Sequence, residues 1–174
     1  SFQEYAREVR YAFLCRVARD GHCAAVATGH HADDQAETVL MRLLRGTAAS
    51  GAAGIPPVTV LHGVPVVRPL LRCARADIVA WLEARSIPWR EDKTNAEPGY
   101  LRNRVRLELL PLLARGYNPR VRDALIRFAD ALRADAEYLD HLAEEAYASC
   151  VDVAWAVDRA RFRADSEQQL YDTL

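Results

Sequence analysis

The sequence predicts an α/β domain that passes, near residue 100, into an α-helical region. Three observations predict it: amphipathic spacing over residues 3–20, an unbroken apolar run over residues 23–28, and a helical apolar pattern from Leu101 to about Tyr147. The chain has 174 residues, of which 51% are hydrophobic and 27% are charged. This composition is typical of a soluble globular protein, and the length allows one sizeable core.

The first predicted helix covers residues 3–20 and ends at Gly21. Its apolar side chains recur every four residues and form one stripe, made of Tyr5, Val9, Phe13 and Val17. The apolar run over residues 23–28 lies directly before Gly29. Such a run is typical of a strand that is buried on both faces, as in a parallel sheet.

A second helix is predicted to start near Asp33 or Asp34 and to stop at Gly46. Its predicted core face carries apolar residues at helical spacing, namely Ala36, Val39, Leu40, Leu43 and Leu44. The order helix, strand, loop and helix is the rhythm of an α/β fold.

Residues 46–57 are rich in Gly, Ala and Ser and are predicted to form a loop. Two short apolar runs, residues 58–61 and 64–67, then flank His62-Gly63, which predicts a tight hairpin. A helix follows over about residues 75–84, and an irregular polar stretch over residues 90–99. The helical pattern after Leu101 is predicted to be interrupted at Pro111 and at residues 117–119.

The formal net charge is −1, but the charges are unevenly spread. Residues 102–127 hold seven arginines and two acids, whereas residues 130–145 hold six acids and one arginine. The arginine-rich segment is consistent with a phosphate-binding stripe, since guanidinium groups suit phosphate oxygens. Two solvated helix faces explain the same pattern equally well.

The composition and the motifs argue against a secreted or membrane-spanning protein. No stretch approaches the roughly 20 apolar residues of a membrane span, and the first residues have no basic and apolar leader pattern. The four cysteines form no C-x-x-C pair, so we expect them to stay reduced in a cytoplasmic protein.

Polar residues are densest between Thr28 and Thr38, where the predicted strand ends and the next helix starts. Ligands bind at this edge of open α/β sheets. Asp34 and Glu37 are three residues apart, so on a helix their carboxylates share a face and can together hold one cationic group. A plainer interpretation is that Asp33 or Asp34 caps the helix and Glu37 favours its positive end.

A metal site is an alternative interpretation of this cluster. The residues His30, His31, Asp33 and Asp34 are all of types that bind metals, which would suggest a metal-dependent hydrolase. Adjacent histidines point in different directions at a strand end, however, and the cluster has no histidine pair four residues apart. Residues 46–51 have the glycine spacing of a Walker A loop but lack its Lys and Ser/Thr.

Several blocks of residues follow one another in a distinctive order. They are Ala6-Arg7-x-x-Arg10-Tyr11-x-Phe13-Leu14, Thr28-Gly29-His30-His31-x-Asp33-Asp34-Gln35-x-Glu37-Thr38, Gly54-Ile55, Val67-Arg68-Pro69-Leu70-Leu71, Glu91-Asp92-x-x-Asn95 and Arg102-Asn103-Arg104-x-Arg106. Through these blocks the sequence resembles the tRNA(Ile)-lysidine synthases, which belong to the PP-loop ATP pyrophosphatases with a Rossmann-like α/β domain.

The resemblance implies an ATP-dependent ligase that joins free L-lysine to C2 of the first anticodon cytidine of tRNA(Ile) with a CAU anticodon. In this family ATP first adenylates the C2 oxygen, and the ε-amine of lysine then attacks C2. The resemblance implies catalytic roles for Asp34, Glu37 and Arg10. It places His30 and Asp33 near the nucleotide or its Mg²⁺. The residues implied to contact the tRNA are Arg68, Asn103, Arg104 and Arg106.

The resemblance also implies a domain organisation. Residues 1–110 correspond to the C-terminal portion of the PP-loop ATPase domain, and residues 111–174 to a helical linker and the start of the tRNA-binding region. The family's phosphate-binding loop, Ser-Gly-Gly-x-Asp-Ser, does not occur in the sequence. We therefore expect that loop to precede Ser1 and the 174 residues alone to be inactive. A truncated sheet would expose an edge, so a homodimer is an expected form of association.

Three alternatives stay open. A sulfur-transferring PP-loop enzyme acting on tRNA usually depends on paired cysteines, and the chain has none. The metal-dependent hydrolase follows from side-chain chemistry alone. A non-catalytic fragment that only binds RNA is the third.

Overall fold

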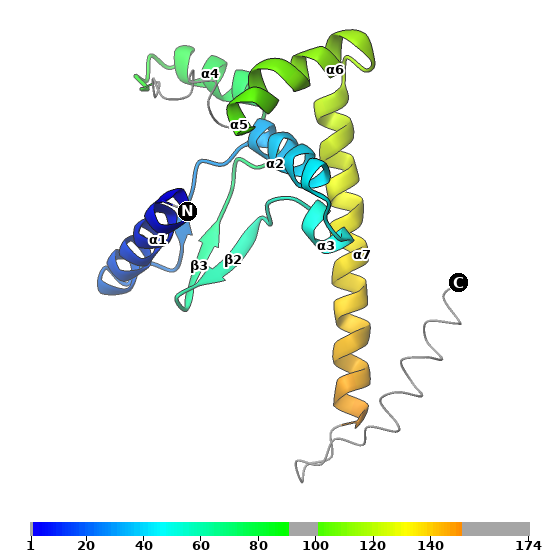
Figure 1. Cartoon of the computed structure of the whole chain (residues 1–174). Helices are drawn as coiled ribbons and strands as arrows, with labels where there is room; N and C mark the ends of the chain where they lie inside the picture. The colour runs from blue at the N-terminus through cyan, green and yellow to red at the C-terminus, as the bar shows by residue number, and fades with distance from the viewer. Residues whose placement is uncertain (1, 91–100, 151–174) are drawn as a thin grey trace. The chain divides into compact units, whose positions relative to one another are not determined.

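The computed structural model describes residues 2–90 and 101–150 and divides the chain into two compact units, one up to Asp130 and one from Ala131. The described elements are shown in Figure 1. In chain order they are α1 (Phe2–Asp20), β1 (Val26–Ala27), α2 (Ala32–Arg45), α3 (Ala49–Ala52), β2 (Val58–Leu61), β3 (Val64–Val67), α4 (Arg75–Glu83), α5 (Leu101–Arg104), the π-helical segment η2 (Val105–Leu109), α6 (Leu110–Gly116) and α7 (Val121–Cys150).

The sheet of the first unit has three strands in the order β1-β3-β2. β1 runs parallel to β3 with Val26 opposite Val66, and β2 runs antiparallel to β3. The turn between β2 and β3 has positive φ at both central residues, 48° at His62 and 75° at Gly63. Two positive φ values match the twist of a two-residue hairpin. The predicted α/β class and the predicted hairpin are confirmed.

β1 is shorter and less covered than the sequence predicts. It has two residues, and within the described part of the chain it pairs only with β3. Ala27 is exposed, so the expectation of a strand buried on both faces is wrong for this chain. The reason is that β1 lies at an edge of the sheet, with a described neighbour along one side only.

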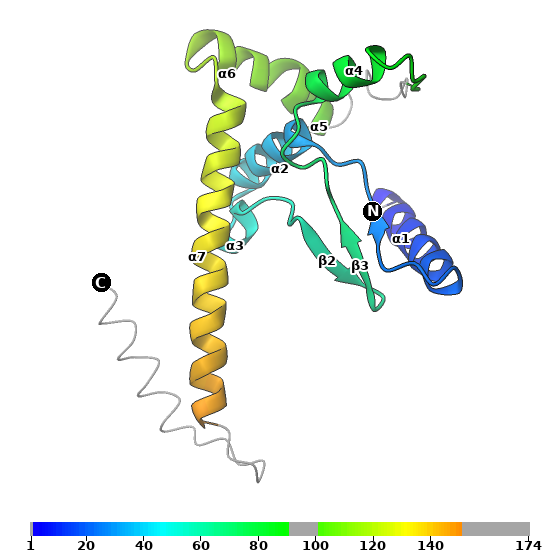
Figure 2. The ribbon, with the colours of Figure 1, turned by 180° about the vertical axis from the view of Figure 1, so that it is seen from behind.

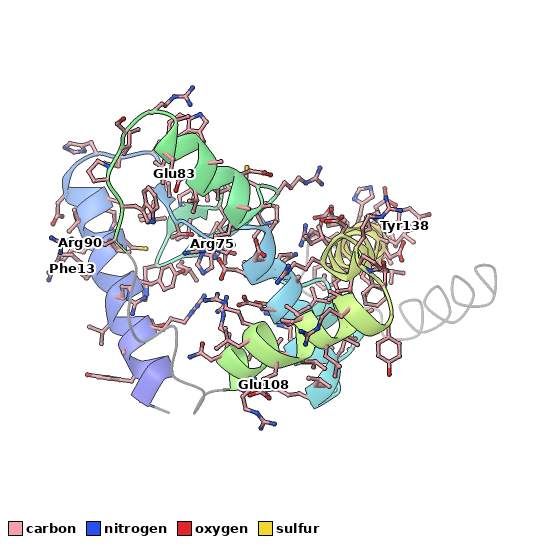
Figure 3. All side chains as sticks on the ribbon, turned by 90° about the horizontal axis from the view of Figure 1, so that it is seen from above. Phe13, Arg75, Glu83, Arg90, Glu108 and Tyr138 are labelled. Carbon is pink, nitrogen blue, oxygen red and sulfur yellow. The ribbon has the colours of Figure 1, made fainter. Side chains whose placement is uncertain are left out.

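α1 lies against the sheet and contacts all three strands, as Figures 1 and 2 show from opposite sides. Its packed side is made of small and aromatic residues, Tyr11, Cys15 and Ala18, which form a core with Val64 and Val66. The stripe predicted from the spacing of four is on another side of the helix. Its four residues are 48–71% exposed, and Phe13 points outward in Figure 3.

α2 begins after β1, one residue before Asp33, and ends where the sequence predicts. Its N-cap is His31, whose Nδ1 accepts from the Asp34 backbone N–H, while the Asp34 carboxylate accepts from the His31 N–H. This reciprocal capping box satisfies two N–H groups that the helix itself cannot. The predicted cap at Asp33 or Asp34 is therefore wrong. Gly46 ends the helix at φ 75°, as expected.

The buried side of α2 is more polar than the predicted core face. Ala36 and Val39 are buried as predicted, but Leu43 and Leu44 are exposed. Gln35 and Glu37 are buried instead. They face two polar neighbours, the loop after α2 and the segment that starts at Leu101.

Gln35 ties α2 to the loop over residues 46–57, within which the short helix α3 forms. Its Oε1 accepts from the Ile55 backbone N–H at 2.6 Å. Arg42 donates to the carbonyls of Gly51 and Gly54 at 2.7 and 2.8 Å. Gly54 has φ 70°, and a Cβ there would lie 2.7 Å from the Gln35 side chain. The glycine is needed for both reasons.

The helix that starts at Leu101 runs through Pro111 without the predicted interruption. Instead, the preceding turn, η2, is widened into a π-helix. Proline lacks the N–H that would bond four residues back, and its ring crowds that carbonyl, so a wider turn relieves the conflict. The break at residues 117–119 is confirmed, since α6 ends at Gly116 and α7 starts at Val121.

The remaining predictions for this part have mixed outcomes. The helix over about residues 75–84 is confirmed as α4. The irregular stretch predicted over residues 90–99 lies almost entirely outside the described residues, as does the Glu91-Asp92-x-x-Asn95 block. No helix in the described ranges combines the length and the apolar character that a membrane span requires.

Candidate functional site

A pocket of about 470 Å³ lies beyond the end of β1, in the first unit. Its volume is within the range of small-molecule sites. Residues from α1, the β1–α2 loop, α2 and α5–η2 line it, among them Arg10, His30, Asp34, Arg102, Asn103 and Arg106. The pocket therefore lies at the carboxyl end of a strand, where the sequence places its densest polar cluster.

Asp34 and Glu37 lie on one face of α2, as their spacing predicts, and both bind arginines of the α5–η2 segment. Arg102 donates from Nη2 to Asp34 Oδ1 at 2.7 Å and from Nε to Glu37 Oε2 at 2.9 Å. Arg106 donates from Nε to Glu37 Oε1 at 2.6 Å and from Nη2 to Glu37 Oε2 at 3.1 Å. It also reaches Asp34 Oδ1 at 3.4 Å. We call these four residues the arginine–carboxylate cluster.

Burial and charge make this cluster strong. The Glu37 side chain is 1% exposed, whereas Arg106 is 27% and Arg102 is 40% exposed. The hydrogen bond to Glu37 is the main cause of a raised pKa at Arg106. Two carboxylates face two guanidinium groups, so the cluster has no net charge. The cationic group that the two acids were predicted to hold is supplied here by the chain itself.

His30 lies at the pocket and is held by the end of β1. Its Nδ1 is 2.9 Å from the Thr28 hydroxyl. Burial is the main cause of a lowered pKa at His30, and Arg68, Arg7 and Arg102 lower the pKa further, while Asp34 opposes them. The imidazole is therefore neutral at pH 7 and can act as a hydrogen-bond donor and acceptor toward a ligand.

Asp33 is turned toward other elements and is not among the pocket-lining residues. Its Oδ2 accepts from the backbone N–H of Arg75, the first residue of α4, at 2.9 Å. Its Oδ1 is 3.3 Å from Arg122 Nε. These contacts make Asp33 an N-terminal cap for α4 and an anchor for the start of α7.

The four residues expected to contact RNA do not form one surface. Arg68 is buried and donates to the Pro56 carbonyl at 2.7 Å and to the Thr59 hydroxyl at 3.0 Å. Asn103 is buried at the pocket, and Arg106 belongs to the arginine–carboxylate cluster. Arg104 is exposed and lies 3.8 Å from Glu108, which faces outward in Figure 3.

The metal-site alternative receives no support from the geometry. Among the residues that the structure describes, no group of three or more His, Cys, Asp or Glu side chains is placed to hold a metal ion. His31 caps α2, and both aspartates bind arginines. The idea of a metal-dependent hydrolase built on His30, His31, Asp33 and Asp34 is therefore dropped.

Two residues that organise the site were not singled out from the sequence. Arg102 binds both acids, and buried Gln35 fixes the loop behind them. A signal for Arg102 exists, because it is four residues before Arg106 and the two share a helical face. A pair of arginines at that spacing matches a pair of acids on another helix.

Residues 1–113 match the PP-loop domain family. This match, with the strand-end pocket and the α/β sheet, shows that the chain belongs to that family. Several similar proteins are named tRNA(Ile)-lysidine synthase. The protein from Symbiobacterium thermophilum is 45% identical over 150 residues, which cover 86% of this chain and 31% of that protein. The protein from Thermus thermophilus is 47% identical over 144 residues, covering 83% of this chain and 27% of the relative.

A third relative, from Geobacter sulfurreducens, is 44% identical over 146 residues, or 84% of this chain and 30% of that protein. The chain thus spans about a third of the length of these curated relatives. A solved structure, the U34-tRNA thiolase NcsA from Methanococcus maripaludis with its [4Fe-4S] cluster, aligns with a TM-score of 0.56. That alignment covers 74% of this chain and 43% of the thiolase at 19% identity, and it supports the fold alone.

Proposed function

We propose that these residues form part of an ATP-dependent ligase that joins free lysine to C2 of the first anticodon cytidine of tRNA(Ile). The observation that carries the proposal is the 44–47% identity to proteins named tRNA(Ile)-lysidine synthase over more than four-fifths of this chain. The strand-end pocket, with Asp34 and three arginines on its walls, is consistent with a site for an amine and a nucleotide.

The proposed reaction has two steps, adenylation of the cytosine and displacement of AMP by lysine. The C2 oxygen of the cytosine attacks the α-phosphorus of ATP, and pyrophosphate leaves. The ε-amine of lysine then attacks C2 and loses a proton, and AMP leaves with the former C2 oxygen. Asp34 and Glu37 would orient the ammonium group of lysine, because two carboxylates on one helix face suit one cation. Arg10 would stabilise charge on the substrate from α1.

The described residues fit ATP better than they fit Mg²⁺. Arg10 and neutral His30 offer donors toward the pocket, and family membership implies the use of ATP. The acids that could hold Mg²⁺ are each bound by an arginine. No step is therefore assigned to a metal ion. His30 would contact the nucleotide, and the same role for Asp33 would require it to leave Arg75 and Arg122.

The partners follow from the same proposal. Unstacked anticodon bases are the usual targets of sequence-specific RNA recognition, and the exposed Arg104 would contact a phosphate. A CAU anticodon, a homodimer and a cytoplasmic location stay predictions. Because Arg68 and Arg106 are engaged inside the protein, we assign them to holding the site rather than to direct RNA contact.

The test is incorporation of labelled lysine into tRNA(Ile) with a CAU anticodon by the full-length protein, with and without ATP. We expect incorporation that requires ATP and is lost in Asp34→Ala and Glu37→Ala, whereas Glu83→Ala on α4 retains it. No incorporation by a folded full-length protein would overturn the proposal. Binding of the tRNA without incorporation would favour the RNA-binding alternative. The isolated 174-residue chain, expected to be inactive, is assayed beside it.

A further inference from the structure

The two acids proposed to hold lysine are already bound by arginines of their own chain. Asp34 Oδ1 accepts from both Arg102 and Arg106, and Glu37 Oε2 accepts from the same two side chains. Asp34 Oδ2 accepts from the His31 backbone N–H. These contacts use most of the lone pairs that the two carboxylates offer.

A cluster with two negative and two positive groups does not attract a further cation. An ammonium group can bind Asp34 and Glu37 strongly only if one guanidinium group leaves. The cluster then still has two positive and two negative groups. The site is thus occupied by an internal competitor whose chemistry matches that of the substrate amine.

The two arginines differ in how readily they can leave. Arg106 donates from two nitrogens to the fully buried Glu37, and its side chain is 27% exposed. Arg102 makes one hydrogen bond to each acid, and its side chain is 40% exposed. Both arginines line the pocket. Bidentate pairing with a buried carboxylate is the stronger of the two arrangements.

We propose that Arg102 is an exchangeable occupant of the amine site: the ammonium group of the substrate replaces it between Asp34 and Glu37, while Arg106 stays bound to Glu37. This inference rests on the proposed function. Arg106 is then a positioning residue, and Arg102 selects for ligands whose cation competes with a guanidinium group.

The released Arg102 needs a new anionic partner, and an RNA phosphate supplies one. A guanidinium group exchanges a carboxylate for a phosphate with little loss, because both accept paired N–H groups. RNA and lysine therefore bind cooperatively, since a phosphate that holds Arg102 frees the acids. Without RNA, only those molecules in which Arg102 has left the acids can bind lysine. The apparent affinity for lysine is therefore lowered in proportion to that fraction.

The experiment is a calorimetric titration of the full-length protein with L-lysine, with and without the tRNA. The variants are Arg102→Ala and Arg102→Gln, and Arg85→Ala on α4 is the control that removes an arginine outside the cluster. Without tRNA, we expect both Arg102 variants to bind lysine at least about fivefold more tightly than the wild type, as in typical coupling between sites. In these variants the tRNA should no longer improve lysine binding.

Two comparisons make the result specific. L-norleucine, which lacks the ε-ammonium group, should show no tightening in either variant. Arg106→Ala removes the same charge but leaves Arg102 between the two acids and Glu37 without its bidentate partner, so it should tighten lysine binding less than Arg102→Ala does. Thermal unfolding checks that each variant is folded, and Arg102→Gln keeps the side-chain stem if Arg102→Ala proves unstable.

Lysine affinity that is unchanged or weaker in folded Arg102→Gln would overturn the inference. If the wild type nevertheless incorporates lysine into tRNA, the proposed function stands and only the exchange of Arg102 fails. If the wild type neither binds lysine nor incorporates it, both fail.

Discussion

The Nε of Arg106 lies 2.6 Å from Oε1 of Glu37, and the glutamate is almost completely buried while the arginine reaches the pocket. This pair joins α2 to the helix that begins at Leu101, which is 64 residues after Glu37. The bond therefore links two motif blocks that are far apart in the sequence. It also explains why a charged residue is tolerated inside the packed face of α2.

Replacing Glu37 with glutamine should destabilise the protein. The variant weakens three hydrogen bonds from Arg102 and Arg106 and leaves their charges uncompensated at that position. Because both arginines are partly exposed, we expect a loss of about 1–3 kcal/mol in the free energy of unfolding. Urea unfolding at pH 7 measures it. Glu108→Gln, which removes an exposed acid, should change the value by less than about 0.5 kcal/mol.

Gly54→Ala should cost more stability than Gly63→Ala, although both glycines have φ between 70° and 75°. A Cβ at Gly54 would lie 2.7 Å from buried Gln35, whereas a Cβ at Gly63 meets nothing within 4 Å. The left-handed backbone alone costs about 1–2 kcal/mol at either site. The extra loss at Gly54, seen as a larger fall in the urea midpoint, measures the close approach. Equal losses would show that Gln35 moves aside freely.

His30 should titrate below the usual value of about 6.5, because burial disfavours its charged form. Between that lowered pKa and 6.5, the unfolded chain binds more protons than the folded one. The free energy of unfolding therefore falls as the pH drops through this window. Imidazole NMR signals give the pKa directly, and His30→Gln should remove this part of the pH dependence. A pKa at or above 6.5 would contradict the burial argument.

Arg104 and Arg68 should respond differently in RNA binding. Arg104→Ala removes an exposed guanidinium group, so the slope of log affinity against log salt should become shallower by about 1. Arg68→Ala should leave that slope unchanged and lower the free energy of unfolding by about 1–3 kcal/mol, since the side chain holds Pro56 and Thr59. The slopes come from tRNA titrations at several salt concentrations. A shallower slope in Arg68→Ala would return Arg68 to the RNA-contacting group.

Local signals in the sequence were sufficient for several elements. His62-Gly63 predicts the hairpin because few residue pairs accept two positive φ values. Gly46 predicts the end of α2 because a helix commonly ends with a residue of positive φ. Asp34 and Glu37 could be placed on one face of α2 from their spacing alone. In each case the residues that decide the geometry are neighbours in the chain.

The predictions that failed depended on distant partners. The Tyr5–Val17 stripe has the right spacing for a core face, but the sheet packs on the side of Tyr11 and Cys15. Periodicity gives the faces of a helix and does not say which one is covered. Likewise, the occupant of the Asp34–Glu37 pair lies more than 60 residues away, so the spacing places Arg102 and Arg106 on one face but does not say that this face meets the acids.

The widened turn η2 accommodates one extra residue within this helix. Val105 and Leu110 are both buried although they are five residues apart, a spacing that an α-helix would place on different sides. Deleting one residue from this turn would restore ordinary α-helical winding. Five residues in a widened turn and four in an ordinary turn cover nearly the same angle, so Arg102 would keep its direction relative to Leu110. A one-residue deletion within this turn would thus leave Arg102 facing the acids on α2.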